Sequence, residues 1–483
     1  MKTSTLLSSA FTALTVYGAS SESYVPRTYS TIMPSASQIA DDAADAKTSH
    51  VSSNVKGSGF SRIGIIWLEN TDYDKAAEDE NLAWLASQGI TLDNYWALIH
   101  PSEPNYLASV GGDYFSLNDD RFIQMPENVS TIVDLLDTKN ISWAEYQEHL
   151  PYTGFQGFNY SNQETFANDY VRKHNPLVLY ESVTNNPERL SRIKNFTEFT
   201  DDLNNKALPQ YFIITPNMTN DGHDSTIKVA GQWSRDFLEP LLSNEYFMND
   251  TLIVLTFDEN DTYSIKNKVF TILLGGSIPD SLKGTNDSTF YDHYSQISSV
   301  EANWNLPSLG RHDVDANVFQ VVANATNITN KDVDTTYMVN NETYVGYLLD
   351  DQIAFPAPNV TAINRNGKGV LSDIVSKWSS ECSAQVSASY FTATTTTVSG
   401  YITDGATLVA KSASASAAGS ASASAAGSAA GSASGSVSGS ASSSKASASG
   451  NSSSSASHGQ GSAVDGRLSL FTIAAIFAIS LVL

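Results

Sequence analysis

Short apolar runs that end in acidic or amide residues are the feature that most constrains the fold of this chain. RIGIIWLEN (62–70) and DTLIVLTFDEN (250–260) each place apolar residues on both sides of an extended strand. Such strands are buried on both faces, which requires a mostly parallel sheet covered by helices. Segments with helical spacing, such as 79–89 and 224–243, alternate with the strands. The sequence therefore predicts an α/β fold with a mostly parallel sheet flanked by helices on both faces.

Other segments extend this alternation along the chain. The further strands are expected at 90–99, 141–147, 208–217 and 268–276, and the further helices at 128–140 and 292–304. Serine and aspartate are preferred helix caps, so we expect Ser130 to begin the helix at 128–140 and Asp224 the helix at 224–243. Ligands of such sheets bind beyond the carboxyl ends of the strands, where the informative residues are expected.

The two ends of the chain predict a route to the cell surface. Lys2, a short apolar run and small residues are typical of a secretory signal peptide, and the apolar stretch Leu468–Leu483 is typical of the removed signal of a glycosylphosphatidylinositol (GPI) anchor. The predicted division is 1–20 signal peptide, 21–54 N-terminal extension, 55–385 catalytic domain, 386–464 Ser/Ala/Gly-rich disordered stalk and 465–483 GPI-anchor signal. The mature protein would be secreted and anchored to the plasma membrane or cell wall.

Composition narrows the possible partners. The chain has 27 Lys and Arg against 51 Asp and Glu, a net charge of −24, which makes it a poor non-specific ligand of nucleic acid. Cys382 is the only cysteine, so no intrachain disulfide is possible. Many Asn-x-Ser/Thr sites predict a glycoprotein, although we expect Asn217 and Asn260, inside the motifs below, to be unused. The sequence carries no signal for an oligomeric state.

Polar residues gather where the predicted strands end. Glu69 and Asn70 follow one strand, Asp258 and Glu259 follow another, and the histidine-containing stretch 217–224 follows a third. We expect these groups at one edge of the sheet. Several carboxylates in one place repel one another unless a cation lies among them, and Glu, Asp and Asn oxygens suit hard divalent cations. The sequence therefore predicts a divalent metal ion, of unknown identity, at this edge.

Ser102 lies in HPSEPNYLAS (100–109), between Pro101 and Pro104 and directly after the strand expected at 90–99. A tight turn alone would explain these residues. Close to a metal, however, a serine hydroxyl has a lowered pKa and can attack as a nucleophile. No G-x-S-x-G turn surrounds Ser102, so the pattern favours a metal-activated nucleophile.

Five motifs in order resemble those of one family. LEN, HPSEPNY, NMTNDGHD, TFDEND and YDHYSQISSVE, within about residues 60–315, are similar to motifs of the phosphoesterase family of fungal secreted acid phosphatases. Bacterial acid phosphatases and phospholipases C belong to the same family. The resemblance implies a fold similar to that of alkaline phosphatases. It also implies acid phosphatase activity on small phosphate monoesters through a covalent phosphoserine.

The resemblance also implies roles for single residues. The metal-binding residues would be Glu69, Asn70, Asp258 and Glu259. The second pair is Asp-Asp in some members, so Glu259 departs from their pattern. The catalytic residues would include Ser102 as nucleophile, with His223, His174 and His293. Two residues have a structural alternative: His293 could cap its helix, and Asn105 either hydrogen-bonds a phosphate oxygen or starts the helix after Ser102.

Positive charge and alternative functions complete the expectations. No lysine or arginine lies in the motifs, so the metal and histidines protonated at acid pH are the expected charge sources. A phosphodiesterase or phospholipase C would use the same core, and the Tyr- and Phe-rich segment 145–205 could line either pocket. An inactive wall-anchored structural protein would keep the fold alone. A sulfatase or phosphonate hydrolase would need a modified Cys or Ser in a different motif, which the sequence lacks.

Overall fold

The computed structural model describes residues 33–344, 346–349 and 355–382. The predicted signal peptide, the stalk, the GPI-anchor signal and part of the N-terminal extension lie outside the described residues, so these assignments stay predictions. Within the described ranges, no helix is both long enough and apolar enough to cross a bilayer.

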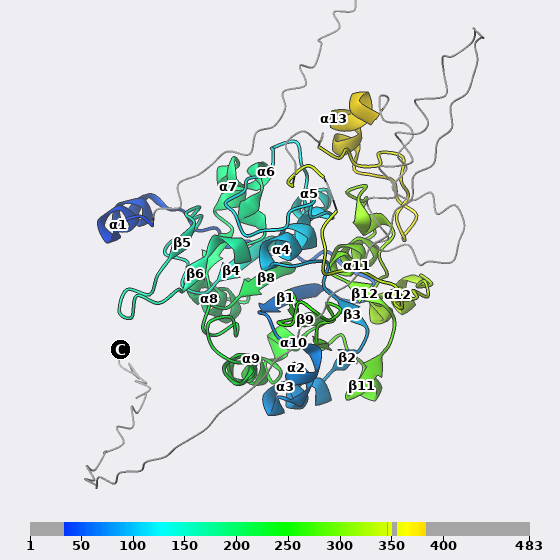
Figure 1. The fold of residues 1–483 in the computed structure, drawn as a ribbon, viewed down its shortest axis with the longest axis horizontal. Coiled ribbons are helices and arrows are strands. Elements are labelled where there is room, and N and C mark those ends of the chain that lie inside the picture. The colour runs from blue at the N-terminus through cyan, green and yellow to red at the C-terminus, as the bar shows by residue number, and fades with distance from the viewer. Residues whose placement is uncertain (1–32, 345, 350–354, 383–483) are drawn as a thin grey trace, which may run out of the picture. The chain divides into compact units, whose positions relative to one another are not determined.

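An eight-stranded sheet with the order β11-β2-β10-β9-β1-β8-β4-β7 forms the centre of the fold (Figure 1). Its strands are β1 (Arg62–Leu68), β2 (Ile90–Leu92), β4 (Trp143–Gln147), β7 (Ile193–Asn195), β8 (Tyr211–Thr215), β9 (Thr251–Phe257), β10 (Thr271–Leu274) and β11 (Thr285–Asp287). All neighbours are parallel except at β10, which runs antiparallel to β9 and β2. All residues of β8 and β9 are buried, which explains their apolar composition.

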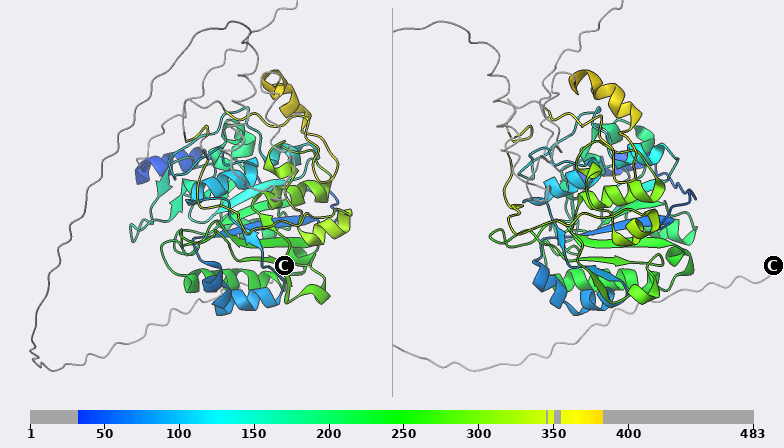
Figure 2. Two further views of the ribbon diagram at one scale, coloured as in Figure 1. Left: turned by 45° about the vertical axis from the view of Figure 1, so that its right-hand side comes forward. Right: turned by 90° about the vertical axis from the view of Figure 1, so that its right-hand side faces the viewer.

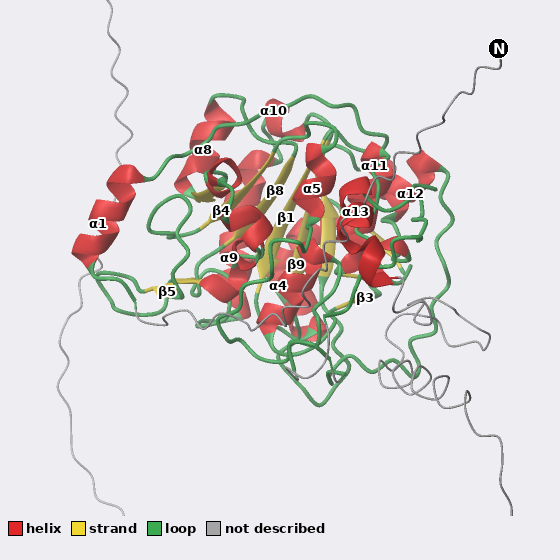
Figure 3. Cartoon of the chain, turned by 90° about the horizontal axis from the view of Figure 1, so that it is seen from above, coloured by secondary structure: helices red, strands yellow, loops and turns green. Residues whose placement is uncertain are grey.

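Helices cover both faces of the sheet, as Figures 2 and 3 show. On one face α2 (Tyr73–Glu78), α3 (Glu80–Ser87) and α9 (Ile227–Leu241) pack on one another. On the other face α4 (Ser102–Gly111) packs on both α5 (Ile132–Asp137) and α11 (Tyr294–Trp304). The predicted α/β class, with a mostly parallel sheet between helices, is confirmed.

Further described elements complete the fold. They are α1 (Ala36–Asp45), α6 (Glu181–Thr184), α7 (Pro187–Leu190), α8 (Thr197–Asn204), α10 (Glu245–Met248), α12 (Gln320–Thr326), α13 (Ser372–Cys382), the short strands β3 (Tyr95–Trp96), β5 (Asn159–Tyr160), β6 (Tyr170–Val171) and β12 (Tyr291–Asp292), and the 3₁₀ turns η1 (Arg172–His174), η2 (Leu177–Leu179), η3 (Asp280–Leu282) and η4 (His312–Val314).

The strand expected at 90–99 is wrong as a single element. A turn at Asp93 and Asn94 divides it into β2, which joins the main sheet, and β3, which pairs with β12 in a separate ribbon. Ser102 therefore does not end a strand of the main sheet. It is the first residue of α4, and the His100–Pro101 peptide before it is cis.

The two expected helix caps are also wrong. α5 begins after Thr131, whose N–H donates to the Asp134 carboxylate at 2.7 Å, rather than at Ser130. α9 begins after Thr226, because Asp224 instead pairs with His223. The two helices thus begin one and two residues later than expected.

Candidate active site

Three adjacent strands bring acidic residues to one place. Glu69 follows β1, Asp258 follows β9, and Asp221 lies in the loop after β8. The Glu69 N–H donates to the Asp221 carbonyl at 2.9 Å, and the Asp258 N–H donates to the Leu68 carbonyl at 3.1 Å. All three carboxylates and that of Glu259 are buried. The structure thus assembles the acidic cluster expected at this sheet edge.

Ser102 faces this cluster from the other side. Its Oγ lies 3.2 Å from Glu69 Oε2 and 3.3 Å from Glu259 Oε1, and the residue is 1% exposed. The hydroxyl comes from the first turn of α4, whereas the carboxylates come from the strand ends. Two parts of the fold therefore meet at the serine.

Asn105 holds the turn that positions Ser102. Its side-chain NH₂ donates to the carbonyls of Ile99 at 2.8 Å and Pro101 at 3.2 Å, and its Oδ1 accepts from the Leu98 N–H at 3.0 Å. Both ends of this buried amide are therefore occupied by backbone. These contacts disfavour the expected hydrogen bond from Asn105 to phosphate and favour the alternative, a structural role at the helix start.

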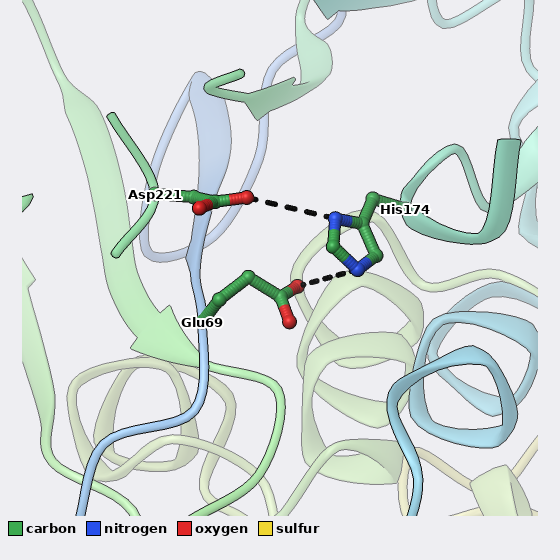
Figure 4. Close-up of side chains that lie close together, drawn as sticks. All are labelled: Glu69, His174 and Asp221. Carbon is green, nitrogen blue, oxygen red and sulfur yellow. Dashed lines mark ion pairs between the residues drawn. The ribbon is translucent and has the colours of Figure 1, made fainter. Parts of the chain in front are cut away.

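Glu69, His174 and Asp221 form a compact group of metal-ligand type (Figure 4). His174 Nε2 lies 3.3 Å from Glu69 Oε1, and its Nδ1 lies 3.6 Å from Asp221 Oδ2. One ligand atom of each residue lies within 4.8 Å of the others. His174 Nε2 and Asp221 Oδ2 are buried and have no hydrogen-bond partner. Imidazole and carboxylate atoms left unpartnered in this way fit a divalent metal.

The charges of the cluster lead to the same conclusion. Burial, and then the nearby Asp258 and Asp221, raise the pKa of Glu69 well above its ordinary value. Burial, and then Asp258, do the same to the pKa of Glu259, and burial raises the pKa of Asp258 to about 6. Buried carboxylates that repel one another take up protons unless a cation lies among them. A bound divalent cation would relieve this repulsion.

The predicted metal ligands surround this centre but only one belongs to the compact group. Asn70 adopts a left-handed backbone conformation (φ 43°), and its N–H donates to Asp258 Oδ1 at 3.3 Å. Asn70 Oδ1 and Asp258 Oδ2 are buried and unpartnered. Glu259 accepts hydrogen bonds from Ser102 and from His100 Nδ1. Only Glu69 is shared with the group of Figure 4.

The histidines differ sharply in their surroundings. Burial, and then Lys173, lower the pKa of His174 well below its ordinary value, because a buried imidazolium loses its hydration. This direction disfavours the cationic His174 expected at acid pH and favours the neutral imidazole that binds metals. His223 is 26% exposed, lies 5.8 Å from the His174 ring between ring centroids, and pairs through Nδ1 with Asp224 Oδ1 at 2.7 Å.

His293 contacts the backbone of the site. It is fully buried, and its Nε2 donates to the Asp258 carbonyl at 2.6 Å. Its side chain does not cap α11, although it precedes that helix. His293 therefore holds the backbone of Asp258 through a hydrogen bond. This role is neither helix capping nor a direct contact with the nucleophile.

Several residues of the site were missed in the sequence. His100 bonds Glu259, and the Tyr106 hydroxyl donates to Glu69 while its ring stacks on that of His174. Lys173 lies 2.9 Å from Asp120, and its charge offsets part of the rise that burial causes in the pKa of Glu69, Asp221 and Glu259. Lys173 lies outside the five motifs, so it adds a positive charge to the metal and histidines that were expected as charge sources. His100 and Tyr106 lie within HPSEPNY, so the motif itself carried their signal.

The aromatic segment 145–205 does not act as one pocket wall. Tyr146, Phe155 and Tyr170 are buried in the core, where Phe155 packs edge-on against Tyr152 and Tyr170. Phe166, in contrast, is 78% exposed. Most of these rings therefore stabilise the fold rather than line a substrate pocket.

Comparison with known proteins shows the family to which the chain belongs. A sequence profile of the Phosphoesterase family matches residues 72–307. The chain is 68% identical over 398 residues to a Kluyveromyces lactis protein named "Probable acid phosphatase", covering 82% of this chain and 94% of the relative. It is 64% identical over 313 residues to an acid phosphatase of Aspergillus fumigatus, and the match covers 65% of this chain and 70% of the relative.

Among solved structures, an alkaline phosphatase superfamily protein of Vibrio parahaemolyticus matches with a TM-score of 0.33 and 10% identity, covering 53% of this chain and 68% of that chain. The likeness is confined to part of each chain. The close relatives, by contrast, match along nearly their whole length or most of it. The chain therefore belongs to the phosphoesterase family and is one of its acid phosphatases, hydrolases of phosphoric esters.

Proposed function

We propose that this acid phosphatase hydrolyses phosphate monoesters through a covalent phosphoserine at Ser102. The observation that carries the proposal is the position of Ser102 Oγ, 3.2 Å from Glu69 and 3.3 Å from Glu259, at the edge where the sheet collects its carboxylates. A buried hydroxyl between two carboxylates has a proton acceptor on each side. A serine that only closes a turn needs neither.

A divalent metal ion fits the same place. Glu69, His174 and Asp221 would hold it, with Asn70 and Asp258 offering further unpartnered oxygens. Once bound, such an ion supplies positive charge that stabilises the charge developing on the phosphoryl oxygens. The fit rests on the donor set and on the orphaned buried atoms of the site.

The chain's own residues support a two-step reaction. Ser102 Oγ forms a bond to phosphorus while its proton passes to Glu259 or Glu69, and the bond from phosphorus to the alcohol oxygen breaks. The partly exposed His223 gives that oxygen a proton. In the second step a water molecule forms the new bond to phosphorus, one of its protons returns to His223, and Ser102 Oγ leaves and recovers its own proton. Phosphate is released.

Lys173 adds fixed positive charge beside the reacting group. Its ammonium is 17% exposed and is held at 2.9 Å by Asp120, whose other oxygen accepts the N–H of Glu103, the residue after the nucleophile. Lys173 also directly precedes His174. A dianionic monoester entering a cluster of carboxylates requires such a charge.

Phosphoserine trapping tests the nucleophile. The enzyme is mixed with a ³²P-labelled monoester, quenched in acid and digested, and the labelled peptide is mapped. Label is expected on the peptide that carries Ser102 and is expected to be lost in Ser102→Ala. Ser109→Ala is the matched control, because Ser109 is an equally buried serine of the same helix that bonds only the Tyr106 carbonyl. Label elsewhere, or persistent label in Ser102→Ala, overturns the assignment.

Chelation tests the metal. Exhaustive dialysis against a chelator is expected to abolish monoester hydrolysis, and titration with single divalent ions to restore it. Binding is also read without activity, as a rise of the thermal unfolding midpoint on re-addition of the ion. Full activity of a protein shown by elemental analysis to be metal-free contradicts the proposal.

We also propose secretion and a GPI anchor as the localisation, supported by the composition of the chain ends. Phosphatidylinositol-specific phospholipase C is expected to release the activity from spheroplasts, whereas a secreted form lacking 465–483 is expected in the medium. Activity that stays with the membrane after this treatment argues against the anchor.

A further inference from the structure

Two loops beside the catalytic serine are joined to each other by hydrogen bonds and form one surface. Lys266 donates to the carbonyls of Thr335 at 2.5 Å and Thr336 at 2.7 Å. The N–H of Asn267 donates to Asn340 Oδ1 at 3.0 Å, and the Asn340 NH₂ returns a bond to the Asn267 carbonyl at 3.2 Å. The loops 261–267 and 335–341 therefore hold one another in a fixed arrangement.

The inner side of this surface is tied to the segment that leads to Ser102. Met338 packs in a small core with Leu98 and Ile99, and Asn340 donates to the Ala97 carbonyl at 2.9 Å. Asn267 donates to the Ile99 carbonyl at 3.0 Å. The position of both loops is thus fixed relative to the nucleophile.

The outer side exposes large apolar side chains. We call it the apolar lip; its residues and exposures are Tyr263 (56%), Ile265 (49%), Tyr337 (77%) and Val339 (53%). Single exposed apolar residues are ordinary, whereas four within two short loops that hydrogen-bond to each other concentrate apolar surface beside the site.

The apolar lip reaches the active site through Tyr263. The Tyr263 ring stacks on the His100 ring, with centroids 3.8 Å apart and planes 20° from parallel. His100 in turn bonds Glu259, which lies 3.3 Å from Ser102 Oγ. The lip therefore begins one side chain away from the residues that surround the reacting phosphate.

We propose that the apolar lip binds the organic group of the phosphate monoester and selects substrates whose organic group is apolar or aromatic and uncharged. This inference rests on the proposed function of Ser102. The small size of this four-residue apolar surface and its position next to Glu259 suit a small organic group. The acidic flank, with Asp334 and Glu342 exposed, disfavours an anionic lipid surface or an anionic polymer, because like charges repel. The only lysine on these two loops, Lys266, is engaged by carbonyl groups.

The test compares two monoesters, 4-nitrophenyl phosphate and glycerol 2-phosphate. The double variant Ile265→Ser/Val339→Ser removes apolar surface and leaves Tyr263 and His100 in place. Its kcat/KM for the aryl ester is expected to fall about tenfold, because two partly buried aliphatic contacts are lost, whereas the value for the glycerol ester stays within about twofold. A selectivity ratio that does not change overturns the inference.

Matched controls separate this outcome from other causes. Phe166→Ser removes an exposed aromatic ring from the β5–β6 hairpin and is expected to leave the ratio unchanged. A change in the ratio there would place the organic group on that hairpin instead. Binding of the wild type to uncharged phosphatidylcholine vesicles that is lost in the double variant, with an unchanged ratio, would assign the lip to a lipid surface.

Trapping keeps the two proposals distinguishable. The double variant should still form phosphoserine at Ser102 from glycerol 2-phosphate at the wild-type rate. Absence of Ser102 label in the wild type would sink the proposed mechanism. If the wild type is labelled at Ser102 but the selectivity ratio of the double variant is unchanged, only the proposal for the apolar lip is contradicted.

Discussion

Two clusters of buried charged side chains differ in whether they are complete without a ligand. In the first, Lys194 and Asp202, both 1% exposed, form an ion pair. Asp202 also accepts hydrogen bonds from Tyr146 at 2.5 Å and His50 at 2.7 Å. Each charge thus has its partners within the chain.

The second cluster, around Glu69, is built differently. Its carboxylates repel one another, and Asp221 Oδ2, Asp258 Oδ2 and His174 Nε2 are buried without a hydrogen-bond partner. Orphaned buried polar atoms are costly for folding and persist where something else binds them. In this comparison, the cluster whose charges pair within the chain is structural, whereas the cluster whose buried charged groups lack partners is the functional site.

Glu69→Gln should produce the largest effect and separates the clusters by activity. We expect kcat/KM to fall at least about a thousandfold, because Glu69 contacts the nucleophile and belongs to the metal-ligand group. The thermal midpoint of the metal-stripped variant should not fall, since one of the repelling carboxylates is gone. Steady-state kinetics and thermal unfolding measure both. The exposed Glu188→Gln serves as control, and retention of a tenth of the activity in Glu69→Gln would contradict the comparison.

Asp202→Asn should show the opposite behaviour. Removing one partner of a buried ion pair leaves Lys194 unmatched, so the free energy of unfolding should fall by about 3 kcal/mol or more. The kcat/KM per folded molecule should stay within about twofold. Urea denaturation gives the first quantity and kinetics on the folded fraction the second. A stable variant with impaired catalysis would show that the Asp202 cluster is not merely structural.

Lys173→Gln tests whether the site needs fixed positive charge. We expect kcat/KM to fall roughly ten- to a hundredfold, mainly through KM, because the ammonium attracts the dianionic phosphate. Lys173→Arg should recover part of the loss. Lys283→Gln is the matched control, an exposed lysine paired with Asp280 at 2.7 Å. An unchanged KM in Lys173→Gln would remove Lys173 from substrate binding.

The central sheet could be predicted from the sequence because its strands are buried on both faces. β1, β8 and β9 are continuous apolar runs, and that pattern alone indicates their place between helix layers. The strand expected at 90–99 failed for a local reason. A two-residue turn in an apolar stretch leaves little signal, and β3 finds its partner β12 almost two hundred residues away.

Residues of the site could be predicted from the sequence where they lie at the end of a strand. Glu69 and Asp258 follow their strands directly, so their meeting follows from parallel pairing of β1 and β9. Lys173, in the 3₁₀ turn η1, and Asp120, in a loop, are brought together only by tertiary packing, and no spacing in the sequence indicates their contact. For Asn105 the sequence left open a bond to phosphate or a role at the helix start, and the backbone carbonyls of its own turn occupy its NH₂ group.

Glu145→Gln gives the smallest effect and extends the comparison to a single buried carboxyl group. Glu145 Oε1 accepts the Leu177 N–H at 3.1 Å, Oε2 has no partner, and burial raises the pKa of Glu145 to about 8. Between its ordinary pKa and 8 the folded state holds one proton more than the unfolded state, so this group makes stability fall as pH rises through that window. Glu145→Gln removes this pH-dependent contribution to the free energy of unfolding. Its stability advantage over wild type should therefore grow by about 3.5 kcal/mol from pH 5 to pH 8, measured by urea denaturation, whereas the exposed Glu78→Gln should show no such pH-dependent change. An advantage independent of pH would mean that Glu145 is matched by a charge and belongs with the Asp202 cluster.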